Sequence, residues 1–129
     1  MTHVVLDASA ILALLKSERG ASKVAGVIGD ASMCAINQAE VISHFVHLGA
    51  PLDEVRAMLG ALPYTVVAAD DALAWEAGSL RSVTASAGLS LGDRFCLVLA
   101  KRFGVAAYTA DKAWRDIAGD VGTKVVIIR

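Results

Sequence analysis

The sequence has no excess of charge of either sign, because 12 lysine and arginine residues are balanced by 13 aspartate and glutamate residues. Proteins that coat nucleic acid non-specifically carry a strongly basic surface, so a formal net charge of −1 argues against that class. A local basic rim around a site can still hold phosphate groups. Nucleic acid therefore stays open as a ligand, but a general nucleic-acid coat protein does not.

Cysteine is also scarce, and its two copies, Cys34 and Cys96, lie in apolar stretches. We expect buried free thiols in a reducing compartment rather than a disulfide. No apolar run approaches the length needed to cross a bilayer. Asp7 stands where a signal peptide would place its apolar core, and the start of the chain is not basic. These absences predict a cytoplasmic protein without membrane association.

What is present is a high share of small aliphatic residues, since 56% of the 129 residues are hydrophobic and only 5% are aromatic. A chain of this length is one domain by the usual size range, and it can bury about two-thirds of its unfolded surface. We therefore expect a single compact α/β domain over residues 1–129.

The stretch from Val4 to Leu15 organises the chain. Residues 4–6 are aliphatic and run straight into Asp7, and the apolar residues that follow adopt helical spacing. This pattern predicts a buried strand that ends at Asp7 and a helix that begins at about Ala8. Open α/β sheets bind their ligands at the carboxyl ends of strands, which is where Asp7 would lie.

The spacing of apolar residues along the rest of the chain predicts alternating strands and helices. Further strands are expected at residues 32–36, 64–68, 105–109 and 124–128. Further helices are expected at residues 21–28, from 37 to Gly49, from Pro51 to about 62, from 70 to about 88, from 90 onward and from 111 to 114. This order predicts a mostly parallel sheet with helices on both faces.

Four acids fall at strand-to-helix junctions of this arrangement. Asp7 follows the first strand, Glu40 lies one turn into the helix after the second, and Asp111 lies just past the fourth. Asp93 is in the first turn of the helix that leads into the fourth strand, and it joins the others if that helix begins at the same edge. Converging carboxylates repel one another, and burial adds to the cost of their charge. Hard divalent cations offset that cost, and Mg²⁺ or Mn²⁺ suits phosphodiester cleavage by an activated water.

Each acid also has a structural explanation, because carboxylates in the first turn of a helix are favoured by its dipole and free N–H groups. Glu40 lies three residues after Asn37, and Asp93 lies three residues after Ser90, which is the spacing of a capping box. Capping and metal binding are compatible. Asp7, at the end of an apolar strand, is the hardest of the four to explain as a cap alone.

Four segments in order resemble the signature stretches of PIN-domain ribonucleases, and most closely the VapC-type toxins of bacterial and archaeal toxin–antitoxin pairs. The segments are residues 5–10 (VLDASA), 37–41 (NQAEV), 91–93 (LGD) and 108–111 (YTAD). The resemblance covers essentially the whole chain. It implies a PIN-like three-layer α/β/α sandwich with a mostly parallel five-stranded sheet.

The resemblance also implies a Mg²⁺- or Mn²⁺-dependent endoribonuclease, usually a homodimer, that is silenced by a cognate antitoxin protein. Carried over by position, it assigns the catalytic and metal-binding acids to Asp7, Glu40, Asp93 and Asp111. Asp7 and Asp93 would be the main ligands. Ser9 and Thr109 match hydroxyl positions of the family that would orient carboxylates or waters.

Basic residues flank two of the acids. Arg94 follows Asp93, and Lys112 and Arg115 follow Asp111, so all three could hold RNA phosphates at the rim of the site. Their alternative is a solvated helix face. The two tryptophans, Trp75 and Trp114, are expected to pack rather than to stack on bases.

The sequence thus predicts a toxin that hydrolyses RNA with a metal-activated water. Two alternatives stay open. One is a phosphoryl-transfer enzyme with Asp7 as an aspartyl nucleophile. The other is a catalytically inert PIN-like module that works only by contacting a partner.

Overall fold

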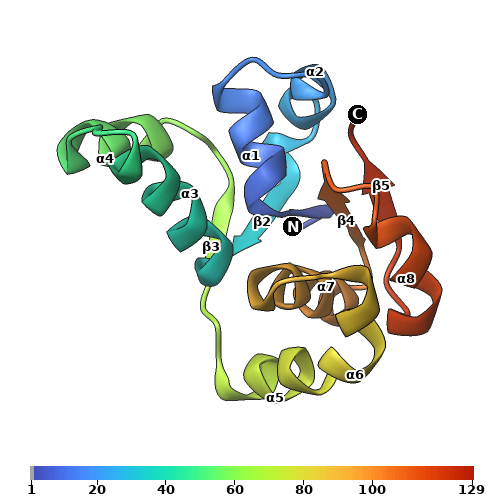
Figure 1. Ribbon diagram of the computed structural model, residues 1–129. Coiled ribbons are helices and arrows are strands. Elements are labelled where there is room, and N and C mark those ends of the chain that lie inside the picture. Colours follow the sequence, from blue (N-terminus) through green and yellow to red (C-terminus); the bar gives the residue numbers. More distant parts are fainter. Residues whose placement is uncertain (1) are drawn as a thin grey trace.

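Five short strands form one fully parallel sheet in the order β3-β2-β1-β4-β5 (Figure 1). The computed structural model describes residues 2–129. The strands are β1 (Val4–Leu6), β2 (Ala31–Cys34), β3 (Thr65–Val67), β4 (Ala106–Thr109) and β5 (Val125–Ile127). Because every pair is parallel, the carboxyl ends of all the strands lie at one edge of the sheet.

Helices cover both faces of the sheet and complete the three layers (Figure 1). One face packs against α1 (Ala8–Leu15), α2 (Ala21–Ala25), α3 (Ala35–His47) and α4 (Leu52–Gly60). The other packs against α7 (Leu91–Phe103) and α8 (Trp114–Val121), and α5 (Asp71–Ser79) lies on α7 while α6 (Arg81–Thr84) lies on α8. Two 3₁₀ turns, η1 (Ile28–Asp30) and η2 (Ala85–Ala87), link these elements.

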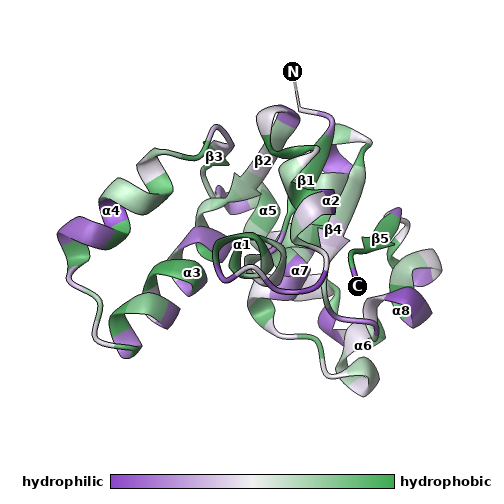
Figure 2. Cartoon of the chain, turned by 90° about the horizontal axis from the view of Figure 1, so that it is seen from above, coloured by the Kyte–Doolittle hydropathy of each residue, from purple (hydrophilic) through white to green (hydrophobic). Residues whose placement is uncertain are grey.

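The central strand β1 shows how the sequence specifies the layers. Val4 and Leu6 pack toward α1, whereas Val5 packs toward α7, and all three are buried. A strand covered on both faces needs a continuous apolar run rather than an alternating one. The hydrophobic colouring of β1 in Figure 2 marks this run. The predicted α/β sandwich is confirmed, and the sheet is parallel throughout.

Three element predictions need correction. The helix expected from residue 70 to 88 breaks at Leu80 into α5, α6 and η2. The helix expected at Asn37 begins at Ala35, so Asn37 is inside it rather than its cap. The helix expected at Asp111 begins only at Trp114.

Two expectations from scarce residues can also be compared with the structure. Cys34 and Cys96 are both buried and free, as predicted. None of the helices in residues 2–129 combines the length and hydropathy that a bilayer span requires.

Candidate active site

Asp7 is the buried centre of the site, and it is 3% exposed. It ends β1 and is the N-cap of α1, where its Oδ1 accepts a hydrogen bond from the Ala10 N–H at 2.8 Å. The cap explains why the chain turns into a helix here, because it satisfies a backbone donor that the first turn leaves free. Asp7 therefore lies between the end of β1 and the start of α1, as the sequence predicts, and its carboxylate caps the helix.

Two hydroxyl groups also donate hydrogen bonds to the Asp7 carboxylate. The Ser9 hydroxyl donates to it, with distances of 2.7 Å to Oδ1 and 2.9 Å to Oδ2. The Thr109 hydroxyl, at the end of β4, donates to Oδ2 at 2.6 Å. A carboxylate offers about four acceptor sites, and these two hydroxyls and the Ala10 N–H supply three hydrogens. By this count the donors among residues 2–129 leave one acceptor position of Asp7 unfilled.

The backbone after β4 fixes both hydroxyls in turn. The Ala110 N–H donates to Ser9 Oγ at 2.9 Å, and the Asp111 N–H donates to Thr109 Oγ1 at 3.0 Å. Ser9 and Thr109 therefore tie the end of β1 to the end of β4 through Asp7. This is the placement that their match to the family's hydroxyl positions implies.

Burial raises the pKa of Asp7 from 3.8 to about 6. The hydrogen bonds from Thr109, Ser9 and Ala10 lower it, and the negative charge of Asp93 raises it further. Desolvation is the largest of these effects, so three donors do not compensate for the loss of water. A nearby cation would supply the compensation that the protein lacks.

Asp93 comes from the first turn of α7, where it forms the predicted capping box with Ser90. Its Oδ2 accepts from the Ser90 N–H at 2.8 Å, and its own N–H donates to Ser90 Oγ at 3.2 Å. Partial burial raises the pKa of Asp93, the bonds from Ser90 and the charge of Arg94 lower it, and the charge of Asp111 raises it. Capping and proximity to other acids therefore coexist at this residue.

Arg94 does not lie at the rim, and this corrects its prediction as a phosphate ligand. Its side chain is buried, with Nη1 donating to the Ala77 carbonyl at 3.0 Å and Nε to the Ser90 carbonyl at 3.4 Å. The neighbours that fix the guanidinium come from α5 and from the N-cap of α7. Arg94 thus secures the start of α7, and its solvated alternative is wrong as well.

Glu40 approaches the same site from α3, although the predicted capping box with Asn37 is absent. The Asn37 amide instead donates to Glu40 Oε1 at 3.0 Å from within the helix, and the N-cap is Cys34. The loss of water around the carboxylate raises the pKa of Glu40, the Asn37 bond lowers it, and the charge of Asp93 raises it. Glu40 is therefore close enough to Asp93 to feel its charge.

Asp111 is exposed at the loop after β4, and its Oδ1 accepts from the Ala113 N–H at 2.9 Å. Lys112 and Arg115 are exposed beside it, which is compatible with a rim position. None of the ion pairs formed within residues 2–129 involves Asp7, Glu40, Asp93 or Asp111. We refer to these four carboxylates as the acidic site.

The donor set of the acidic site suits a hard cation that keeps part of its water shell. Within residues 2–129, no three His, Cys, Asp or Glu side chains are arranged to hold a metal ion. Mg²⁺ usually binds through one or two carboxylates and retains several waters, so it does not need such a cage. Asp7 and Asp93 are near enough for the charge of Asp93 to raise the pKa of Asp7, so these two residues are the candidates for this mode of binding.

Two further features were missed or misplaced by sequence reasoning. Trp114 is fully buried, as expected, but Trp75 on α5 is 76% exposed and does not pack.

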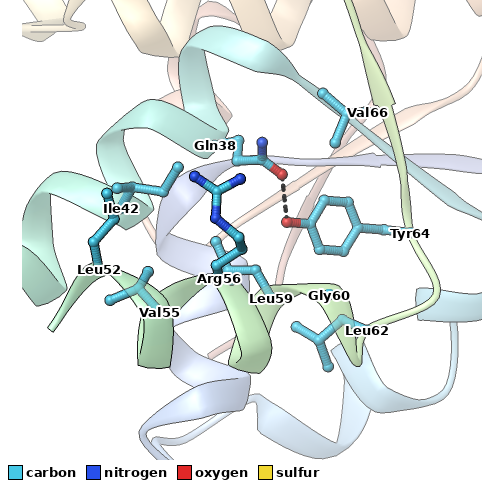
Figure 3. Close-up of a pocket in the computed structure, with 10 residues that line it drawn as sticks. All are labelled: Gln38, Ile42, Leu52, Val55, Arg56, Leu59, Gly60, Leu62, Tyr64 and Val66. Carbon is cyan, nitrogen blue, oxygen red and sulfur yellow. Dashed lines mark hydrogen bonds between the residues drawn. The ribbon is translucent and has the colours of Figure 1, made fainter. Parts of the chain in front are cut away.

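A pocket of about 400 Å³ lies between α3, α4 and β3, where Tyr64 donates to Gln38 Oε1 at 2.7 Å (Figure 3). Its lining contains none of the four acids. The acidic site is therefore distinct from this pocket.

The model of the PIN domain family matches residues 4–120 of this chain, and the chain therefore belongs to that family. Comparison with curated proteins gives no match. The fold is also similar to chains in three solved structures. A toxin–antitoxin complex from Klebsiella pneumoniae has 19% identity, a TM-score of 0.73 and 98% coverage of each chain.

DNA-bound VapBC from Salmonella typhimurium has 17% identity, a TM-score of 0.76 and 100% coverage of each chain. FitAcB from Neisseria gonorrhoeae has 17% identity, a TM-score of 0.75 and 97% coverage of each chain. At this level of identity the three structures show a shared fold. The resemblance to PIN domains inferred from the four sequence motifs is thereby confirmed.

Proposed function

We propose that this protein is a metal-dependent endoribonuclease that hydrolyses RNA phosphodiesters and acts as the toxin of a toxin–antitoxin pair. The observation that supports the proposal is the acidic site, in which desolvation by burial, together with weaker repulsion between neighbouring carboxylates, raises the pKa values of Asp7, Glu40 and Asp93. Such repulsion costs folding stability, so it calls for a cation that the protein recruits.

In this proposal Asp7 and Asp93 hold Mg²⁺ or Mn²⁺, and Glu40 and Asp111 orient water or substrate around it. When bound, such an ion lowers the pKa of water and offsets the charge of a phosphate group. Ser9 and Thr109 keep the Asp7 carboxylate in one orientation. The exposed Lys112 and Arg115 contact phosphates of the RNA backbone.

We also propose a cognate antitoxin protein as partner and a homodimer as the assembly. The antitoxin is suggested by the solved structures of similar fold, which include a toxin–antitoxin complex and VapBC bound to DNA. Co-expression with the product of the neighbouring gene, followed by co-purification, tests the first part. Light scattering of the purified toxin tests the second.

The direct test of the activity is cleavage of single-stranded RNA by the wild type and by Asp7→Asn, with Mg²⁺ or Mn²⁺ and with a chelator. We expect cleavage only by the wild type and only with metal. Equal cleavage by both proteins would show that the acidic site is not the active site. An inert binding module would leave RNA intact under all conditions.

A further inference from the structure

Asn37 is a buried amide that joins two parts of the acidic site. It is fully buried, and its Nδ2 donates both to Glu40 Oε1 at 3.0 Å and to the Gly92 carbonyl at 2.9 Å. Glu40 is on the same helix, whereas Gly92 directly precedes Asp93 on α7. One amide group therefore connects the carboxylate of Glu40 to the backbone that carries Asp93.

The orientation of this amide follows from its two partners, because both are acceptors. A flipped amide would point Oδ1 at the Glu40 carboxylate and at a carbonyl, and it would lose both hydrogen bonds. In the orientation that keeps the bonds, Oδ1 is buried and has no partner among residues 2–129. A buried acceptor without a donor costs free energy, so this placement of the amide calls for an explanation.

Gly92 allows the close approach on the other side of Glu40. A Cβ atom at residue 92 would lie 2.6 Å from Glu40 Cδ, a separation that real side chains do not adopt. The Glu40 carboxyl group thus occupies the place that a side chain at 92 would need. A side chain at residue 92 would therefore have to displace the Glu40 carboxylate from its present position between α3 and α7.

From these contacts we infer that Asn37 is a positioning residue that fixes the Glu40 carboxylate beside Asp93, with Gly92 providing the space. The inference rests on the proposed function, since it takes the acidic site to be the place where metal binds. Asn37 itself does not touch metal or RNA. It acts through Glu40, whose carboxylate it holds by the Nδ2 hydrogen bond.

A double-mutant cycle tests whether Asn37 acts through Glu40. The proteins are the wild type, Asn37→Ala, Glu40→Gln and the double variant, and the readouts are Mn²⁺ affinity by calorimetry, RNA cleavage and urea unfolding. Partners that orient a metal ligand change metal affinity by about 10-fold to 100-fold, so Asn37→Ala should weaken Mn²⁺ binding by at least about 10-fold. In the Glu40→Gln background the same change should have no further effect.

The matched control is Gln38→Ala, the next residue on α3, which bonds Tyr64 on the side away from Asn37's partners. It should bind Mn²⁺ as the wild type does. Additive losses in the double variant, or an Asn37→Ala protein with unchanged Mn²⁺ affinity, would overturn the inference while leaving the nuclease proposal intact. A wild type that neither binds Mn²⁺ nor cuts RNA would overturn both.

Gly92→Ala tests the position of the Glu40 carboxylate without changing Asn37. It replaces Asn37→Ala as the test variant if that protein does not fold. The added methyl group must displace the Glu40 carboxylate, so Mn²⁺ affinity should again fall by at least about 10-fold. Leu91→Ala, at the exposed neighbouring position, is its control and should bind Mn²⁺ normally. Unchanged Mn²⁺ affinity in Gly92→Ala would contradict the proposed fit between α3 and α7.

Discussion

Asp7 and Asp70 are built in the same way, and only their surroundings differ. Each follows a strand and is the N-cap of the next helix, with nearly equal backbone angles of φ −86°, ψ 177° and φ −79°, ψ 174°. Asp7 accepts from the Ala10 N–H and Asp70 from the Leu73 N–H, both at 2.8 Å. By local geometry alone the two residues are interchangeable.

Their pKa values nevertheless move in opposite directions. Burial raises the pKa of Asp7 to about 6, whereas the bonds from Arg102 lower the pKa of exposed Asp70 to about 2. Arg102 donates to both oxygens of Asp70, at 2.8 Å and 3.1 Å, while Asp7 has no ion-pair partner within residues 2–129. A helix cap is therefore structural when a cation within the protein neutralises it, and a candidate ligand when none does.

The largest expected effect is on RNA cleavage by Asp7→Asn compared with Asp70→Asn. Loss of a ligand carboxylate should reduce cleavage by at least about 100-fold, because even the neighbours of metal ligands contribute 10-fold to 100-fold in affinity. Asp70→Asn should cleave at the wild-type rate. Steady-state assays with a labelled RNA measure both, and equal losses in the two variants would remove the distinction.

The second effect is on stability as a function of pH in the metal-free protein. Between the unfolded pKa of 3.8 and the folded value of about 6, folded Asp7 keeps a proton that the unfolded chain has released. Stability should therefore fall as pH rises through this window, by up to about 3 kcal/mol from Asp7. Asp70 has the opposite sign, since its contribution is present above pH 3.8 and is lost as pH falls toward 2.

Urea unfolding in the presence of a chelator, at pH values from 3 to 8, measures this dependence. Asp7→Asn should make the fall above pH 4 smaller, leaving the part that the raised pKa values of Glu40 and Asp93 contribute, and Asp70→Asn should make the decline in acid smaller. A wild-type curve that keeps rising from pH 4 to 7 would contradict the account of Asp7. Adding Mn²⁺ at pH 7 should raise the free energy of unfolding again, because an ion that binds the folded protein offsets the loss caused by ionisation of Asp7.

A smaller effect is expected for Thr109→Val, which keeps the shape of the side chain and removes its hydroxyl. The hydroxyl donates to Asp7 Oδ2 and accepts from the Asp111 N–H, so its loss frees the carboxylate to rotate. Mn²⁺ affinity should fall by about 10-fold. Calorimetry provides the measurement, with Thr65→Val on the exposed edge strand β3 as control.

The smallest effects should separate exposed from buried basic residues. Lys112→Ala and Arg115→Ala should weaken RNA binding a few-fold, and the log–log salt dependence should become shallower by about 0.7 for each phosphate that is no longer neutralised. Arg94→Ala should instead destabilise the fold by about 1 to 3 kcal/mol, because its buried carbonyl partners lose their donor. Binding isotherms at several salt concentrations, together with urea unfolding, distinguish the two outcomes.

The sequence predicts the site well where one residue performs both a local and a tertiary task. The apolar run into Asp7 specifies a central strand, and the cap at Asp7 starts α1 at the expected residue. Ser90 and Asp93 form their predicted capping box because both partners are within one turn. The parallel pairing of β1 and β4 then places Asp7 at the same edge of the sheet as the residues that follow β4.

Prediction fails where the partner comes from another part of the chain. Asn37 has the spacing of a cap, but its amide finds Gly92 on α7, 55 residues away. Arg94 looks like a surface cation until the Ala77 carbonyl from α5 is placed beside it. Asp70 and Asp7 cannot be told apart by pattern, since Arg102 lies 32 residues from Asp70.

The position of Mn²⁺ in crystals soaked with that ion tests most directly whether the carboxylates gather to hold a cation. The anomalous difference map should show a peak about 2.0 to 2.2 Å from a carboxylate oxygen of Asp7 and of Asp93. The same soak of Asp7→Asn should show none there. A wild-type crystal that binds Mn²⁺ elsewhere, or not at all, would mean that these acids are helix caps and nothing more.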